Sequence, residues 1–331
     1  SVQIHQVKER TVRDLSIAGK AVVLHLLGRR FRCKICEGPF TERLRSIGFR
    51  RRQTRRYEQY VYEQCLAQSR KEVAIQEGLS ESTVKEIFVK HAEQTVQERA
   101  TQPVQVLGID EIALKKRHKQ YALVISDLTR HYVLTILPER KKETLVAWLE
   151  ALPDPVRQSI RVVSTDLWEP YRSAVHDALP QAQQVADRFH MMQQLNKRLT
   201  QARRALQKQV DEETRQALKG SRWLLLRARG DLTPEDEEKL RVVLAASDEL
   251  RTIYLLKEEF RLICDKARSR QQAARFLRAW ICKVQLTNNA RLLKFVKTLR
   301  NWWDEFLNYF VARVTQGFVE GINNAIRTLI R

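Results

Sequence analysis

The chain has 331 residues, of which 43% are apolar, and it carries a formal net charge of +21. This size and apolar content predict a folded protein of two or three domains with a sizeable core, and they exclude a basic disordered tail. The 60 Lys and Arg against 39 Asp and Glu predict a polyanionic partner, DNA or RNA; from charge alone, a ribosome-associated protein or a surface for acidic membranes are alternatives.

Cysteine content and hydropathy indicate the cellular compartment. The five cysteines are irregularly spaced, and their odd number argues against a disulfide framework and for a reducing environment. No apolar run approaches the roughly 18 residues of a membrane span. The first residues, SVQIHQVKERTVRDL, lack the apolar stretch of a signal peptide. We therefore expect a cytoplasmic, nucleoid-associated protein with no membrane partner.

The first 48 residues predict a small β-rich module. Residues 20–32 (KAVVLHLLGRRFR) alternate as a strand and turn do, and a CxxC pair, Cys33 and Cys36, follows them. Such a pair is half of a four-ligand zinc site. His5 and His25 are candidates for further ligands. Zinc is therefore an open prediction, and the module is zinc-ribbon-like but incomplete.

Residues 49–102 change to helical spacing and predict a helix-turn-helix. Gly78 breaks the pattern, and Ser80 caps a new helix. The first turns of that helix hold the residues expected to read base edges, which are Ser82, Thr83, Lys85 and Glu86. A run of arginines opens the segment: Arg50, Arg51, Arg52, Arg55 and Arg56. These are either a solvated face or, as we expect beside such a motif, contacts to the DNA backbone.

After Pro103 the pattern changes to an α/β arrangement. We expect three successive antiparallel strands at 104–114, 121–128 and 131–138, then a helix at 141–152, a strand at 161–166, a helix at 168–179 and a strand at 181–188. This order is that of an RNase H-like mixed sheet. We expect a core of residues 103–195 and 317–331, interrupted by an all-α insertion at 196–316. Trp223, Trp280, Trp302 and Trp303 are expected to fill helix packing there.

Two aspartates are placed for metal binding. Asp110 follows the apolar run VLGI, and Asp166 follows VVST, so a parallel pairing of these strands would bring both side chains to one edge of the sheet. Carboxylates at strand ends suit Mg²⁺ or Mn²⁺. The alternative for Asp166 is that it caps the following helix, near Trp168, which we place at the edge of the catalytic groove.

The third carboxylate is predicted from helical spacing near the C-terminus. Val319, Ile322, Ile326 and Leu329 share one face, and the opposite face carries Glu320, Asn323, Asn324, Arg327 and Arg331. That polar face can contact metal and phosphate. Asp304 and Glu305 are competing candidates in a helix crowded with aromatic residues. Glu320 is the preferred third ligand for two-metal phosphoryl transfer.

Asp187 and His190 form a D-x-x-H pattern at the start of a long helix. They are expected to line the groove, with His190 contacting a phosphate. The alternative is that Asp187 caps the helix and His190 is an ordinary boundary residue.

Five segments together resemble the ISL3 family of insertion-sequence transposases. They are GIDE (108–111), KKRHKQYALVISDLTRHYVL (115–134), STDLWEPYR (164–172), ADRFHMMQ (186–193) and GFVEGINNAIR (317–327). They occur in the family's order and extend over most of the chain.

The resemblance implies a DDE transposase in which Asp110, Asp166 and Glu320 hold Mg²⁺ or Mn²⁺. Hydrolysis at a transposon end would expose a 3′-hydroxyl, which would then attack target DNA. The expected partners are double-stranded terminal inverted repeats, target DNA and a second copy of the chain. The family also implies a first cysteine pair before Cys33 and further chain after Arg331. A nuclease with the same core and a transposase-derived DNA-binding regulator are the alternatives.

Overall fold

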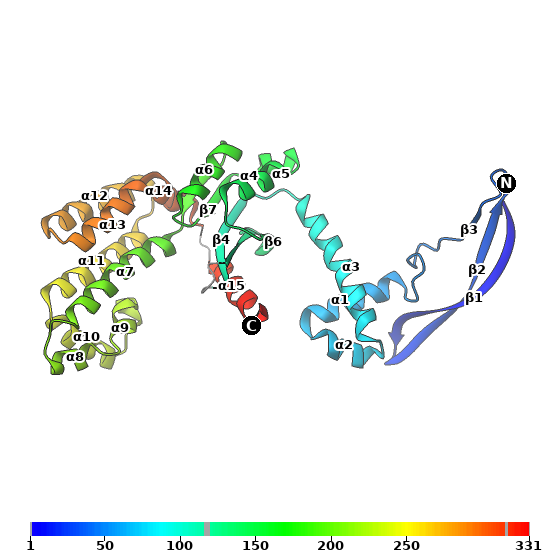
Figure 1. Ribbon diagram of the computed structural model, residues 1–331, viewed down its shortest axis with the longest axis horizontal. Helices are drawn as coiled ribbons and strands as arrows, with labels where there is room; N and C mark the ends of the chain where they lie inside the picture. Colours follow the sequence, from blue (N-terminus) through cyan, green and yellow to red (C-terminus); the bar gives the residue numbers. More distant parts are fainter. Residues whose placement is uncertain (1, 116–119, 315–316, 331) are drawn as a thin grey trace. The chain divides into compact units, whose positions relative to one another are not determined.

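The computed structural model describes residues 2–115, 120–314 and 317–330. Residues 116–119 of the segment that resembles the family, and Arg331, lie outside the described residues. The chain forms two compact units, Ser1–Ala100 and Thr101–Arg331 (Figure 1). Within the described part of the chain, no helix has the length and apolar character needed to cross a membrane.

The first unit begins with a long β-ribbon. β1 (Val2–Ile17) pairs antiparallel with β2 (Lys20–Cys33), and the short β3 (Pro39–Thr41) pairs with β2. Ala18 and Gly19 both have positive φ, 53° and 73°, the geometry of a two-residue turn that matches strand twist. The predicted strand at 20–32 is confirmed. β1 was not predicted as a strand, because charged residues interrupt its apolar alternation.

Three helices complete the first unit: α1 (Arg55–Ala67), α2 (Arg70–Glu77) and α3 (Glu81–Ala100). Gly78, with φ of 63°, ends α2, and the Ser80 hydroxyl accepts the Thr83 amide at 3.2 Å at the start of α3. These are the predicted break and cap. The expected helical start near Arg50 is wrong, because the Thr54 side chain caps α1 and the first three arginines precede the helix.

The second unit contains a five-stranded mixed sheet in the order β6-β5-β4-β7-β8. β4 (Val106–Lys115), β5 (Gln120–Asp127) and β6 (Tyr132–Leu137) are antiparallel, whereas β7 (Val162–Thr165) and β8 (Gln183–Ala186) run parallel to β4. α4 (Lys142–Glu150) and α5 (Asp154–Ser159) precede β7, and α6 (Glu169–Ala178) links it to β8. The predicted strand and helix order is confirmed.

Alternation along β4 assigns its residues to two layers. Leu107 and Ile109 belong to the core shared with α4, α5 and α6. Ile112 lies two residues after Asp110 and therefore on the same face of the strand. It packs with Val319 of α15 (Gly317–Ile330) on the side of the sheet opposite that core. The strand face that carries Asp110 therefore faces the C-terminal helix.

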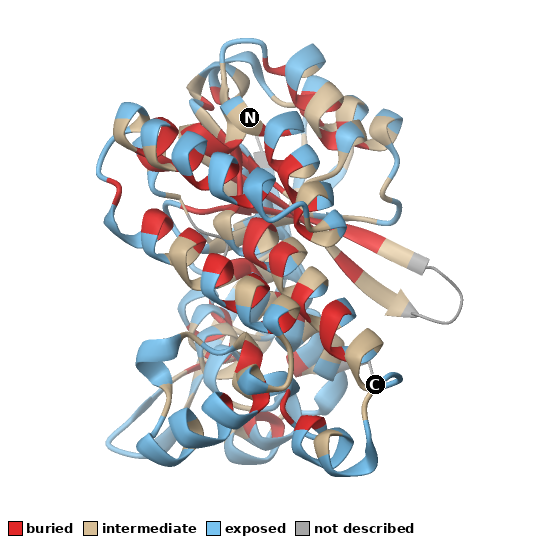
Figure 2. Cartoon of the chain, turned by 90° about the vertical axis from the view of Figure 1, so that its left-hand side faces the viewer, coloured by how far each residue is buried: buried red, intermediate tan, exposed pale blue. Residues whose placement is uncertain are grey.

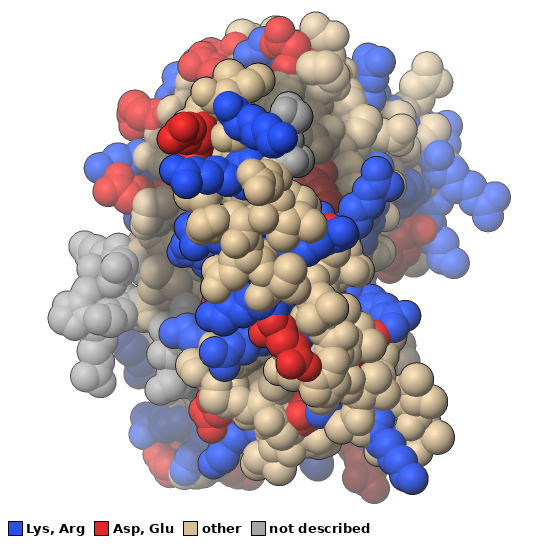
Figure 3. All heavy atoms as spheres, turned by 90° about the vertical axis from the view of Figure 1, so that its right-hand side faces the viewer, with Lys and Arg blue, Asp and Glu red and all other residues tan. Residues whose placement is uncertain are grey.

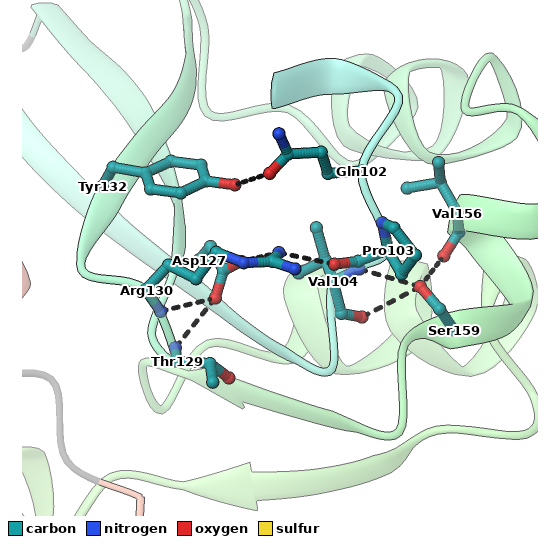
Figure 4. Close-up of polar contacts among 9 residues, drawn as sticks. All are labelled: Gln102, Pro103, Val104, Asp127, Thr129, Arg130, Tyr132, Val156 and Ser159. Atoms are coloured by element: carbon teal, nitrogen blue, oxygen red, sulfur yellow. Dashed lines mark hydrogen bonds and ion pairs between the residues drawn. The ribbon is translucent and has the colours of Figure 1, made fainter. Parts of the chain in front are cut away.

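The segment that leads into β4 is fixed by polar contacts (Figure 4). The Ser159 hydroxyl accepts the Val104 amide at 2.8 Å, and Arg130 donates to the Pro103 carbonyl at 2.6 Å. Asp127, buried at the end of β5, accepts the Thr129 and Arg130 amides at 2.8 and 3.1 Å. These contacts set the start of the strand that carries Asp110.

Between β8 and α15 the described chain is helical. The elements are α7 (Arg188–Leu206), α8 (Glu212–Leu218), α9 (Arg222–Leu226), a 3-10 turn (Arg229–Asp231), α10 (Pro234–Ala245), α11 (Asp248–Lys266), α12 (Arg270–Leu286), α13 (Ala290–Asn301) and α14 (Trp303–Ala312). Buried residues follow one side of these helices and exposed residues the other (Figure 2).

This helical region packs directly on the edge of the sheet. Val185 and Ala186 of β8 share its core, and the Asn308 side chain donates to the Gln184 carbonyl at 2.8 Å, so α14 covers the edge strand. Trp280 and Trp302 fill the core as expected. The expectation for Trp223 is wrong, because this side chain is 65% exposed.

Candidate functional site

Asp110 and Asp166 lie on neighbouring parallel strands. β4 and β7 pair in register up to Ile109 and Thr165, so the two aspartates are the next residues of adjacent strands. The parallel pairing that the sequence predicted is therefore present. Asp110 lies inside β4, within the predicted range 104–114, and not at a strand end: β4 continues to Lys115, because β5 still pairs with it where β7 has ended.

Asp110 is held by two hydrogen bonds. One carboxylate oxygen accepts the Glu111 amide at 2.8 Å, and the other accepts the side-chain amide of Asn323 on α15 at 2.7 Å. Burial raises the pKa of Asp110 above its usual value, and the nearby negative charge of Asp166 adds to this effect. The negatively charged form of Asp110 is therefore less stable in this site than in water. A bound cation would favour that charged form.

His190 is hydrogen-bonded to Asp166. Its Nδ1 atom lies 2.9 Å from a carboxylate oxygen that also accepts the Leu167 amide at 2.7 Å. Burial opposes the charged forms of both groups, but their mutual hydrogen bond outweighs it. It lowers the pKa of Asp166 and raises the pKa of His190 to about 9. In this structure Nδ1 of His190 is engaged by Asp166, and the expected contact of His190 with a phosphate stays a prediction.

Asp187 caps a helix, as one interpretation of the sequence expected, whereas Asp166 does not. Asp187 is the N-cap of α7 and accepts the Phe189 amide at 3.1 Å, as its alternative interpretation stated. It also lines the cavity described next. Asp166 is not the cap of α6, because Trp168 occupies that position.

A cavity of about 730 Å³ contains these groups. Its lining includes Asp110, Asp166, Asp187, His190, Glu320 and Asn323. Among the described residues, ligand atoms of Asp110, Asp166 and His190 lie within 4.8 Å of one another. The two carboxylates fit a divalent cation that prefers oxygen ligands, such as Mg²⁺ or Mn²⁺, whereas the His190 imidazole is engaged by Asp166.

Glu320 enters the same cavity from α15, but it is not part of that close cluster. Arg327, about two helical turns further along α15, also lines the cavity, and its guanidinium donates to the Asn324 side chain at 2.9 Å. The competing candidates are occupied elsewhere: Asp304 pairs with Arg270 at 2.6 Å, and Glu305 with Arg172 at 2.6 Å.

Two residues expected in the groove are not part of the cavity lining. Asn324 is exposed on the outer side of α15. Trp168 packs edge-on against Tyr171 at 4.5 Å, and the Arg140 guanidinium lies 5.4 Å from its ring centroid. Trp168 therefore supports the core behind Asp166.

The helices between β8 and α15 contribute residues to the cavity that the sequence did not reveal. Leu226 of α9 and Arg261 of α11 line it, and Arg188 at the start of α7 pairs with Asp265 of α11 at 2.6 Å. No motif marks Arg261, which follows Asp166 by almost a hundred positions. Only the packing of α11 against α7 brings it to the site.

The CxxC pair lies at the end of β2. Cys36 is exposed, and hydrogen bonds from the backbone of Cys36 and Ile35 lower the pKa of the Cys33 thiol, which favours a metal-binding thiolate. His25 cannot join this pair: it lies eight residues away on the same strand, about 26 Å at roughly 3.3 Å per residue. Among the described residues, no group of three metal ligands includes the pair.

The arginine run divides into two sets. Arg51 pairs with buried Glu58 at 2.9 Å and also with Glu86, and Arg56 donates to buried Asp14 at 2.7 Å. The pKa of Asp14 is lowered chiefly by that hydrogen bond. These two arginines therefore hold the unit together. Arg50, Arg52 and Arg55 are exposed and are available to phosphates.

Ser82 and Lys85 of α3 line a shallow groove with Arg70 and Lys71 of α2. Thr83 is turned toward the Ser80 hydroxyl, 2.8 Å away. The sequence prediction omitted Arg70 and Lys71, although their place at the start of α2 is a recognisable signal. Lys and Arg are spread over the face of the molecule drawn in Figure 3, in blue.

Comparison with known proteins gives consistent matches over the chain. A family model described as a transposase of the ISL3 DDE type matches residues 107–331. The helix-turn-helix domain of transposase family ISL3 matches 42–92, and the zinc-finger of transposase IS204/IS1001/IS1096/IS1165 matches 1–36.

Two curated relatives carry the same description. The transposase for insertion sequence element IS1001 of Bordetella parapertussis is 32% identical over 99% of this chain and 81% of its own length. The transposase for IS1557 of Mycobacterium tuberculosis (strain CDC 1551 / Oshkosh) is 27% identical over 68% of this chain and 55% of its own length. The chain therefore belongs to the ISL3 family of insertion-sequence transposases.

Proposed function

We propose that this chain is a DNA transposase that cleaves DNA at the ends of an insertion sequence and joins the freed 3′ end to a target. This proposal depends mainly on one observation. Asp110 and Asp166, from adjacent parallel strands, lie with His190 in one cavity, and the potential ligand atoms of the three side chains are within 4.8 Å of one another. The transposases named among its relatives support the reaction class and disfavour the nuclease and regulator alternatives.

Asp110, Asp166 and Glu320 are the proposed ligands of Mg²⁺ or Mn²⁺, with His190 beside them. When bound, the divalent ions supply positive charge that activates the attacking oxygen and stabilises the leaving oxygen of an in-line displacement. The attacking oxygen belongs to water in the first reaction and to the new 3′-hydroxyl in the second. In each, the bond from phosphorus to the leaving oxygen breaks.

The other residues of the site orient the two aspartates and offset the negative charge of the DNA. Asn323 fixes the direction of the Asp110 carboxylate through its 2.7 Å hydrogen bond. His190, protonated at neutral pH, orients Asp166, and its second N–H is a donor suited to a phosphate oxygen. Arg188, Arg261 and Arg327 line the cavity and would offset the charge of the DNA backbone.

The remaining proposals follow from the modular organisation. The strand order β6-β5-β4-β7-β8 supports an RNase H-like core at 103–195 and 317–331 with an insertion at 196–316. The segment 1–48 is proposed to bind Zn²⁺ through Cys33 and Cys36, and 49–102 to bind the terminal inverted repeats. Coordinated handling of two ends would require at least a dimer, working at the bacterial nucleoid.

The test is strand cleavage of DNA that carries the element's own end, compared with random DNA, in the presence of Mg²⁺. Asp110→Asn and Asp166→Asn should bind the end normally and lose cleavage. A wild-type protein that cuts both DNAs equally would make the chain a nuclease of this fold. Zinc content of the full chain, compared with Cys33→Ser, tests the zinc proposal independently.

A further inference from the structure

The short helix α9 separates two hollows of the second unit. Leu226, at its end, lines the catalytic cavity, whereas Trp223 and Leu224 line a second hollow of about 380 Å³ that α10 also lines. Trp223 and Leu226 are less than one helical turn apart. Leu226 and Arg227 are consecutive residues that line the first and the second hollow, so the two hollows adjoin at the end of α9.

Trp223 is unusual among the aromatic residues of this unit. Its side chain is 65% exposed, while Trp280 and Trp302 are buried. The Arg222 guanidinium lies 4.8 Å from the centroid of the Trp223 ring. An exposed indole with a cation on its ring has the composition of a stacking platform for nucleobases.

The charges around Trp223 favour a polyanion. Lys219, Arg227 and Lys239 line the hollow, and Asp236 is its acidic residue, paired with Arg227 at 2.9 Å. Within the described chain, Lys219, Arg222 and Lys239 form no salt bridge. We name these three residues and Trp223 the α9 patch. Its charge complements DNA and would repel another basic chain.

A buried lysine holds α9 in place. Lys257 of α11 is fully buried, and its ammonium donates to the Leu225 carbonyl at 2.8 Å and the Arg227 carbonyl at 3.1 Å. Glu258 pairs with it at 2.5 Å and also accepts the Arg229 amide at 3.0 Å. Because a buried charge is costly unless it is fully hydrogen-bonded, this network favours one position of α9. The network therefore fixes the backbone at the end of α9, the helix that carries Arg222 and Trp223.

We propose that the α9 patch binds DNA at the point of strand breakage. A base that separates from its partner at the free strand end stacks on Trp223, and the flanking phosphates contact Lys219, Arg222 and Lys239. This inference rests on the proposed function, because strand cleavage supplies the free end at which a base can separate from its partner. A protein partner in the same hollow is the competing outcome of the test.

The test is a binding measurement on the full chain without divalent ions, so that catalysis plays no part. The probes are two duplexes of the element's end, one intact and one broken at the cleavage position with an unpaired 2-aminopurine at the break. Trp223→Ala should weaken binding of the broken duplex about tenfold and abolish the fluorescence change, while intact DNA binds as before. Trp223→Phe should retain most of the affinity.

The control is Leu286→Ala, which removes an 87% exposed apolar side chain from α12, outside the patch, and should bind both probes as wild type does. Unchanged binding of broken DNA by Trp223→Ala would overturn the proposal. The proposal would also be overturned if Trp223→Ala, measured in solution without DNA, had a different oligomeric mass from wild type. That result would identify the patch as a protein interface. Failure of the wild-type chain to bind either probe would instead contradict the proposed function.

Discussion

The side-chain amide of Asn323 donates a 2.7 Å hydrogen bond to Asp110, joining the C-terminal helix to the first strand of the sheet across 213 positions. Asn323 is 3% exposed, so water cannot readily replace it. α15 therefore brings more to the site than Glu320, because it also orients one of the two strand aspartates.

Replacing Asn323 should damage catalysis without removing a proposed metal ligand. Asn323→Ala leaves the Asp110 carboxylate with one partner fewer, at a cost of about 1.5–3 kcal/mol for a hydrogen bond to a charged group. We expect cleavage of the element's end to fall about tenfold or more. Asn324→Ala, on the exposed side of the same helix, is the matched control. Equal rates for the two variants would contradict the assigned role.

The ion pair of His190 and Asp166 predicts a pH dependence of stability. The pKa of His190 is raised to about 9, so the stability that its protonated form contributes is fully present below its unfolded pKa of about 6.5. That stability is lost as pH rises through 9. The pair contributes up to about 3 kcal/mol, counted once for both partners.

The measurement is denaturant unfolding of the metal-free protein between pH 6.5 and 10. Wild type should lose stability over this range, and His190→Gln should lack that loss while starting from a lower stability. Parallel pH curves for the two proteins would show that the pair does not hold in solution.

Gly108 is required by the close approach of Leu128. A Cβ atom at position 108 would lie 2.8 Å from two Leu128 side-chain carbons. Gly108→Ala should therefore lower the free energy of unfolding by about 1–3 kcal/mol. Gly321→Ala, where the added methyl meets open space in α15, should be neutral or stabilising by about 0.5–1 kcal/mol. If adding Leu128→Ala to Gly108→Ala did not reduce the effect of the glycine substitution, the steric explanation would fail.

The helices α2 and α3, which line the shallow groove of the first unit, should act differently on DNA. Lys71→Ala at the start of α2 should weaken all DNA and reduce the salt dependence of log K by about 0.9 per lost phosphate contact. Lys85→Ala on α3 should instead reduce the preference for the element's end over random DNA. Titrations at several salt concentrations measure both quantities. An unchanged preference in Lys85→Ala would assign α3 to backbone contact.

Regular local patterns made the sheet predictable. The runs before Asp110 and Asp166 are short, β-branched and followed by polar residues, so their strands and parallel pairing could be predicted. The spacing of Ser80 and Thr83 likewise predicted a helix start. Both signals act within a few residues and leave a periodic trace in the sequence.

Contacts between distant segments could not be predicted in the same way. Arg261 reaches the cavity only because α11 packs on α7, and Trp223 is exposed although its neighbours Leu224, Leu225 and Leu226 on α9 belong to or pack against the core. The inward pairing of Arg51 with Glu58 also has no local signal. In each case tertiary packing decides the position of a side chain whose sequence neighbourhood is ordinary.

Asp110, Asp166 and Glu320 are proposed to act together on the scissile phosphate. Single-turnover cleavage of the element's end in Mg²⁺ by Asp110→Asn, Asp166→Asn and Glu320→Gln tests this proposal, with Glu305→Gln as control, since Glu305 is paired with Arg172 outside the cavity. We expect the first three variants to bind DNA as wild type does and to lose at least about a hundredfold in rate, while Glu305→Gln keeps its activity. Substantial cleavage by Glu320→Gln, or by either aspartate variant, would contradict it.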